Sequence, residues 1–265
     1  IQKSDNNLIA IVSNPPKPMN RGRLLYSTPV GEYAKKNDIR LLEPESLDSI
    51  NFKRILEGLK PDIFILVAFK IIPNELINIP IHGAINLHAS LLPKYRGAAP
   101  IQWALMNGDT ETGISIFQIK QKVDTGDIIS QKRVQIFDED NMWTLGMRLC
   151  EIGAVMIVNS IKMISDKTVK YQRQNSNIAT LAPKITREMT LIDWEWENVK
   201  IHNWVRGLSP IPGMSTIYDD KRLRIFKTST LEGRATQPGV IVKAKGKDLI
   251  VSTGKGFIRL IDVQI

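Results

Sequence analysis

Short, continuously apolar runs alternate with helix-sized amphipathic segments along the first half of the chain. The apolar runs lie at residues 8–13, 63–68, 84–87 and 113–119. Uninterrupted apolar runs of this length are typical of parallel strands that are buried on both faces. The segments between them, such as 47–59, are long enough for helices, so the alternation predicts a doubly wound α/β domain.

The pattern changes twice in the second half of the chain. A long amphipathic helix is predicted over residues 142–164, with its apolar face at Trp143, Met147, Cys150, Ala154 and Val158. Residues 169–183 are mostly polar and predict a linker. After residue 184, short β-like runs separated by Asp-Asp, Pro-Gly and Gly-Lys-Gly turns predict a small β-barrel.

Composition and charge narrow the classes of protein that remain. The 265 residues are 43% hydrophobic and 24% charged, as in a globular chain of one or two domains. The net charge of +9 favours polyanionic partners, although a lysine-rich solvated surface gives the same number. The single cysteine, Cys150, excludes an internal disulfide, and its helical neighbours suggest a buried, inert thiol. No apolar run reaches the length of a membrane span, so we expect no membrane partner and a location in the cytoplasm or an organelle matrix.

The candidate chemistry is concentrated in residues 84–100, which read AINLHASLLPKYRGAAP. If the segment begins as a strand, Asn86 and His88 project to the same face, because side chains alternate along a strand. Pro100 suits the first turn of a helix that stops at Gly108. An amide donor and a titratable base are therefore expected together at the rim of a ligand-binding crevice.

This stretch, followed by Val-Asp-Thr-Gly-Asp at 123–127, resembles the signature of the tetrahydrofolate-dependent formyltransferases. The resemblance implies a Rossmann-like, mainly parallel sheet domain that takes 10-formyltetrahydrofolate as formyl donor. In the implied reaction Asn86 is the oxyanion donor, His88 is the donor and acid/base, and Asp124 is the orienting carboxylate. The residues implied to contact the folate are Val67, Ala68, Phe69, Ser90, Leu91, Leu92 and Pro93.

Structural alternatives to these roles stay open at the level of sequence. Asn86 also fits a turn-capping amide, and His88 fits an ordinary structural histidine. Asp124 fits an Asx-turn residue, with Asp127 as the competing carboxylate. Phe69 is equally compatible with plain core. No metal site is expected, because the three histidines are scattered and no paired cysteines occur.

Two further stretches point to one branch of the family. The basic loop NPPKPMNRGR at 14–23 and the segment RGLSPIPG at 206–213 look like those of the methionyl-tRNA formyltransferases. This likeness implies initiator methionyl-tRNA as the formyl acceptor, in translation initiation, and an OB-like C-terminal domain. Basic side chains in the loop and on a later strand are the expected RNA contacts, with a merely solvated surface as the alternative; they are Lys17, Arg21, Arg23, Lys221, Arg222 and Arg224.

The expected organisation is a catalytic domain at 1–168, a linker at 169–183 and the OB-like domain at 184–265, acting as a monomer. The family's first strand has no counterpart and the last barrel strand is cut short, so we expect a chain that is incomplete at both ends. A sugar-nucleotide N-formyltransferase and a non-catalytic RNA-binding relative remain as alternative functions.

Overall fold

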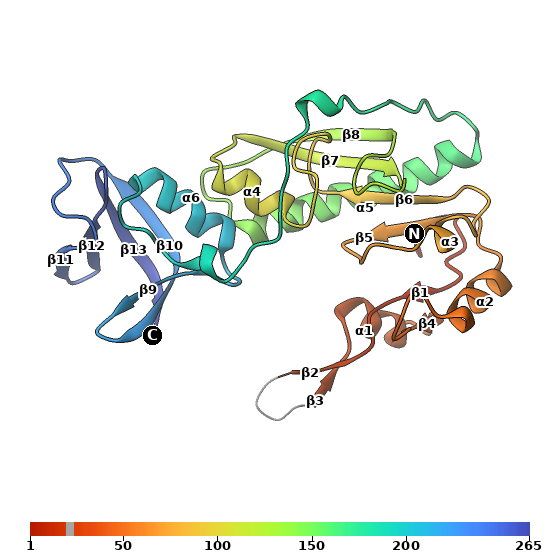
Figure 1. The fold of residues 1–265 in the computed structure, drawn as a ribbon, viewed down its shortest axis with the longest axis horizontal. Coiled ribbons are helices and arrows are strands. Elements are labelled where there is room, and N and C mark those ends of the chain that lie inside the picture. The colour runs from red at the N-terminus through yellow and green to blue at the C-terminus, as the bar shows by residue number, and fades with distance from the viewer. Residues whose placement is uncertain (20–23) are drawn as a thin grey trace. The chain divides into compact units, whose positions relative to one another are not determined.

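The computed structural model describes residues 1–19 and 24–265 (Figure 1). The chain forms two compact units, one of residues 1–87, 116–129 and 154–171 and the other of residues 88–115, 130–153 and 172–265. Four elements contribute residues to both units: β6 (Ala84–His88), β7 (Glu111–Gln118), β8 (Ile128–Gln135) and α5 (Met142–Ser165). The compact units therefore do not coincide with the three segments expected from the sequence, whose boundaries stay a prediction.

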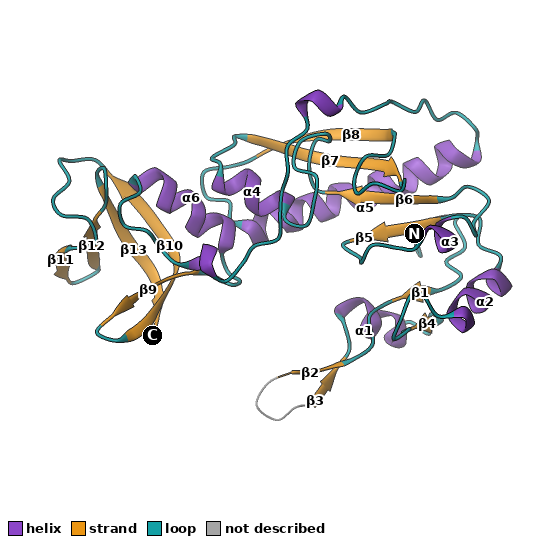
Figure 2. Cartoon of the chain, in the orientation of Figure 1, coloured by secondary structure: helices purple, strands orange, loops and turns teal. Residues whose placement is uncertain are grey.

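The first unit has the predicted alternation of apolar strands and helices (Figure 2). β1 (Ile11–Val12) pairs in parallel with β4 (Leu41–Leu42), and β5 (Phe64–Val67) pairs in parallel with β6. β5 and β6 continue into a four-stranded sheet of order β5-β6-β7-β8. This arrangement confirms the expected α/β class with parallel pairing.

Helices and a short ribbon complete the first unit. The side chains of Thr28 and Ser49 cap the first two helices by accepting backbone N–H bonds at 3.0 and 3.4 Å. Buried residues of the second and third helices form a small core of Phe52, Leu56 and Leu76. The elements are α1 (Pro29–Lys36), α2 (Ile50–Leu59), α3 (Asn74–Ile77) and the antiparallel strands β2 (Lys17–Met19) and β3 (Leu24–Tyr26).

The C-terminal part of the second unit is a helix packed on an antiparallel sheet. α6 (Asn198–Leu208) follows two short 3₁₀ turns, η1 (Ser176–Ile178) and η2 (Glu188–Thr190). The sheet has the order β11-β12-β13-β10-β9. Its strands are β9 (Met214–Tyr218), β10 (Lys221–Leu231), β11 (Ile241–Lys245), β12 (Asp248–Ser252) and β13 (Phe257–Gln264). Among the described residues no pairing joins the edge strands β9 and β11, and every residue of β11 is exposed, so the sheet is open where the sequence predicted a barrel.

The core of this part includes α4 (Pro100–Met106), which begins at the predicted proline. Met106 of α4 is buried together with Ile201 and Val205 of α6 and with Ile225 and Ile258 of the sheet. The Trp103 and Trp204 rings also meet edge to face, with centroids 6.3 Å apart. The helix that follows the candidate loop is thus packed against the C-terminal helix.

Helix α5 corrects two expectations from the sequence. Its buried residues include Leu145, Leu149 and Ile157, whereas Trp143 is 59% exposed and Cys150 is exposed, so the predicted apolar face is the outward one. Among the described residues, α5 is also long and apolar enough by composition to cross a membrane, contrary to expectation. Core helices of globular proteins meet the same criterion, and 33% of its most apolar window is buried here.

Candidate active site

The last residues of strand β6 carry the two candidate groups closest in sequence. β6 is in parallel register with β5, where Leu66 lies opposite Asn86, so the alternation of side chains expected from sequence is present. Asn86 is half-buried in the first unit, and His88 is buried in the second. The strand end therefore carries an amide and an imidazole two residues apart.

The imidazole of His88 is fixed by a backbone carbonyl. Its Nε2 lies 2.7 Å from the carbonyl oxygen of Tyr95, and both residues are buried. A carbonyl accepts a hydrogen bond and has no proton to donate, so Nε2 carries the proton. In the neutral ring Nδ1 is then the nitrogen that accepts a proton.

Asp124 lies in a tight turn between β7 and β8. Its φ is 52°, in the left-handed region, and it is half-buried. Thr125 closes the turn by donating from its hydroxyl to the Lys122 carbonyl at 2.8 Å. The competing carboxylate, Asp127, is paired with Lys120 at 2.6 Å. Because Asp124 belongs to the first unit and His88 to the second, their approach stays a prediction.

The loop after His88 is held by two side chains that sequence reasoning missed. Ser115 donates to the Ser90 carbonyl at 2.6 Å and accepts from the Leu92 amide at 3.0 Å. Gln131 donates to the Leu92 carbonyl at 2.8 Å, and the Ser90 hydroxyl donates to the Lys94 carbonyl at 2.6 Å. Ser115 had a usable signal, since a serine inside an apolar strand must find a hydrogen-bond partner when buried. These bonds fix the backbone of the predicted folate loop.

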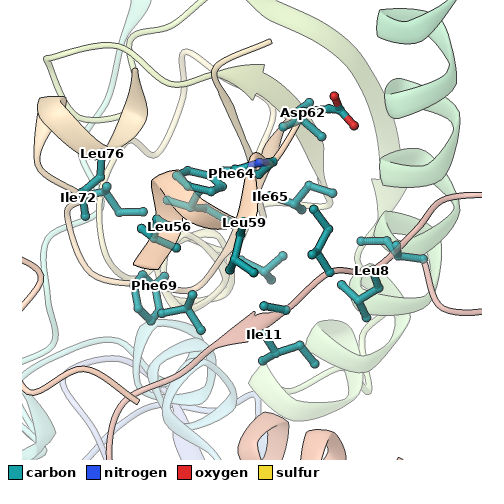
Figure 3. A pocket seen from close by; sticks show the side chains of 18 of the residues that line it. Leu8, Ile11, Leu56, Leu59, Asp62, Phe64, Ile65, Phe69, Ile72 and Leu76 are labelled. Carbon is teal, nitrogen blue, oxygen red and sulfur yellow. The ribbon is translucent and has the colours of Figure 1, made fainter. Parts of the chain in front are cut away.

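Residues 67–69, the other predicted folate contacts, line an apolar pocket of about 970 Å³ in the first unit. Figure 3 shows Leu59, Phe64 and Phe69 around this hollow, with Leu8 and Ile11 from the β1 region. Ser90, Leu91, Leu92 and Pro93 are not among its described lining residues. Residues 67–69 belong to the first unit and the loop at 90–93 to the second, so a shared folate site for the two groups stays a prediction.

The predicted RNA contacts that the structure describes lie on strands β2 and β10. Lys17 is exposed on β2 of the first unit, and Arg21 and Arg23 lie outside the described residues. The other three are exposed on β10, where alternation places Arg222 and Arg224 on the face opposite Lys221 and buried Ile225. Arg222 is also engaged within the protein, because it donates to Ser215 at 3.1 Å and Thr190 at 3.3 Å.

Comparison with known proteins gives matches along most of the chain. A family model described as formyl transferase matches residues 1–161, and one described as formyl transferase C-terminal domain matches residues 184–265. A methionyl-tRNA formyltransferase of Thermodesulfovibrio yellowstonii is 42% identical, covering 97% of this chain and 83% of the relative.

Two solved structures share the fold. An N-formyltransferase of Helicobacter canadensis, in complex with folinic acid and dTDP-3-aminofucose, is 20% identical with a TM-score of 0.69, covering 93% of this chain and 87% of that one. A methionyl-tRNA formyltransferase from Clostridium thermocellum is 20% identical with a TM-score of 0.57, covering 75% of this chain and 86% of that one. At such low identity these likenesses concern the fold alone.

The α/β fold and the antiparallel C-terminal sheet, together with the two matching models, define a formyl transferase. The 42% identical relative covers both parts of the chain and specifies the branch. The chain belongs to the methionyl-tRNA formyltransferase family, which confirms the resemblance noted in the sequence.

Proposed function

We propose that the chain transfers the formyl group of 10-formyltetrahydrofolate to the α-amino group of methionyl initiator tRNA, for translation initiation. The observation that carries the proposal is the identity of 42% to a methionyl-tRNA formyltransferase over 97% of the chain. The amide and imidazole at the end of β6 are groups that this chemistry requires.

The reaction needs a hydrogen-bond donor for the developing oxyanion and a route for one proton. The uncharged amine attacks the formyl carbon, forming a C–N bond, and the formyl oxygen gains negative charge. Asn86 donates its amide N–H to this oxygen. His88 takes the amine proton at Nδ1 and returns it to N10 as the bond from N10 to the formyl carbon breaks. Once Nδ1 has taken the proton, the Asp124 carboxylate orients the ring and favours its charged form.

The folate co-substrate contacts two segments in this proposal. Residues 67–69 provide apolar walls, and the loop at 90–93 provides backbone groups held by Ser115 and Gln131. Support for a folate comes from the Helicobacter canadensis relative, which was solved with folinic acid.

The tRNA contacts are assigned to the basic side chains expected from the sequence. In this assignment the C-terminal sheet is an OB-like surface whose β10 side chains meet tRNA phosphates, and the β2 loop region makes further contacts. The protein works as a monomer in the cytoplasm, where charged initiator tRNA is available. The six side chains are Lys17, Arg21, Arg23, Lys221, Arg222 and Arg224.

A formylation assay with two acceptors tests the function. Product is measured by mass spectrometry with charged initiator tRNA or with an amino-sugar nucleotide, each at the same folate concentration. We expect formyl-methionyl-tRNA and no formylated sugar. Formylation of the sugar nucleotide alone would assign the chain to the other branch.

Two neighbouring aspartates provide a matched test of the site. Asp124→Ala should lower kcat by about 100-fold or more, the usual loss when an acid/base group is disturbed. Asp127→Ala in the same turn should stay close to the parent enzyme, because it removes only an exposed pair with Lys120. Full turnover of folded Asp124→Ala would remove the assigned role of this carboxylate.

A further inference from the structure

The loop that follows His88 contacts the His88 imidazole through the backbone carbonyl of Tyr95. The 2.7 Å contact between His88 Nε2 and the Tyr95 carbonyl joins two buried residues, at 6% and 8% exposure. Water therefore has little access to compete for the hydrogen bond. This carbonyl therefore favours the tautomer of His88 that carries the proton on Nε2.

Tyr95 holds a backbone conformation that its own side chain disfavours. Its φ is 59°, in the left-handed region that is costly for a bulky residue. Such a conformation persists only when the surroundings hold it in place. The contacts around Tyr95 therefore determine how firmly its carbonyl is held beside His88.

Contacts at both ends of Tyr95 provide this hold. Its phenol Oη donates to Asp109 at 2.7 Å and accepts from Asn107 Nδ2 at 3.0 Å. Its backbone amide donates to the Thr180 hydroxyl at 2.8 Å. Burial raises the pKa of Tyr95 to about 12, so the phenol remains a donor throughout the neutral range.

Thr180 comes from the segment that the sequence predicted to be a linker. Residues 172–183, here called the strap, pair with the catalytic loop: Arg96 N donates to the Thr180 carbonyl at 2.9 Å, and Ala182 N donates to the Arg96 carbonyl at 2.8 Å. The approach is so close that a Cβ at Gly97 would lie 2.6 Å from the Ala182 carbonyl oxygen. The strap thus contacts the loop segment that contains Tyr95.

We propose that Tyr95 is a positioning residue for formyl transfer, and that Thr180 acts through it. Anchored by the strap and by Asp109, the Tyr95 carbonyl holds His88 as the Nε2–H tautomer and so keeps Nδ1 as the proton acceptor. This inference rests on the acid/base role of His88 in the proposed function.

The test uses the full chain with ¹⁵N-labelled histidine. At a pH where the ring is neutral, wild-type His88 should give the NMR signals of the Nε2–H tautomer, assigned by their loss in His88→Ala. Thr180→Ala removes the acceptor of the Tyr95 amide and should increase the Nδ1–H population. Thr180→Ser keeps the hydroxyl and should restore the wild-type spectrum. Tyr95→Phe should shift the tautomer as well, while Tyr171→Phe, at an exposed tyrosine, should not.

Kinetics provide the second readout. Thr180→Ala should lower kcat roughly tenfold, a part of the acid/base contribution, with little change in KM for the tRNA. An unchanged tautomer and an unchanged kcat in folded Thr180→Ala and Tyr95→Phe would overturn the proposal. Full activity of His88→Ala would instead refute the proposed role of His88, and the tautomer measurement would still decide whether Tyr95 controls the ring.

Discussion

One substitution, glycine to alanine, should have opposite effects at two positions of the first unit. Gly126 follows Asp124 and Thr125, and a Cβ there would lie 1.5 Å from the Gln118 carbonyl oxygen. Gly58 lies within helix α2, where a Cβ would meet nothing within 4 Å. The chemical change is identical at both positions. The difference between the two changes in stability therefore measures how closely the Asp124 turn approaches the end of β7.

The magnitude follows from the distances. Real Cβ contacts are essentially never under 3.0 Å, so alanine at 126 must move the turn and the end of β7 apart by about 1.5 Å. The same two segments are joined by the hydrogen bond from Gln118 N to the Asp127 carbonyl at 2.9 Å. Losing that bond and leaving its groups unsatisfied costs about 3 kcal/mol. Gly58→Ala should instead raise the free energy of unfolding by about 0.5 kcal/mol, because alanine loses less backbone entropy than glycine in a helical turn.

Thermal unfolding and a formylation assay check both effects. Gly126→Ala should lower Tm by roughly 6–12 °C, and Gly58→Ala should raise it by a few degrees. Displacement of Asp124 by an ångström or more should also lower kcat by about 100-fold. Wild-type Tm and kcat in Gly126→Ala would refute the reasoning that this turn is held tightly against β7.

The other predictions concern the second unit. Burial alone would raise the pKa of Asp140, but hydrogen bonds from Arg148, the Phe137 amide and Thr144 hold it below its usual range. Asp140→Asn should therefore cost about 3 kcal/mol by urea unfolding at neutral pH. This cost should begin to shrink as pH falls below about 4, where the carboxyl group of the unfolded chain takes up a proton, and should be lost below the lowered pKa of the folded protein. Burial, with the nearby Arg206 charge, holds the pKa of His202 below its usual value. The unfolded chain therefore binds a proton at this histidine more readily than the folded protein does, and the free energy of unfolding should fall as pH drops below about 6.5. His202→Gln should flatten the pH dependence of the unfolding free energy in this range. Ile201→Ala, at a fully buried position, should cost about 3 kcal/mol, whereas exposed Val199→Ala should cost little by the same unfolding assay. Lys221→Ala combined with Arg224→Ala should make the slope of log K for tRNA binding against log salt concentration shallower, by about 0.7–0.9 per lost phosphate contact, and leave kcat unchanged. Lys247→Ala is the control. An unchanged slope in the double variant would place the tRNA elsewhere.

The strand at 84–88 and the helix at Pro100 were predictable because local rules decide them. An apolar run that ends in Asn-x-His, followed by a proline at a helix start, has few alternative conformations. The face of α5 was not predictable in this way. Its apolar residues occupy more than one side of the helix, so Trp143 and Leu145 carry equal signals and only packing selects between them.

The strap and the anchoring of His88 required tertiary contacts. Nothing in the polar composition of residues 172–183 distinguishes a free linker from a segment that pairs with residues 96 and 99. Likewise, the phenol of Tyr95 reaches Asp109 only because the intervening helix α4 turns the chain back. Sequence predicts candidates for the chemistry, whereas the residues that hold these candidates in place follow from the fold.

The outward position of Cys150 has a practical use. Because it is the chain's single cysteine and is exposed on α5, a maleimide dye will attach at one known position without any engineering. The labelled protein then gives one fluorescence signal per molecule for titrations with folate or tRNA. The same accessibility calls for a reducing agent during storage, since two molecules can become joined through this thiol.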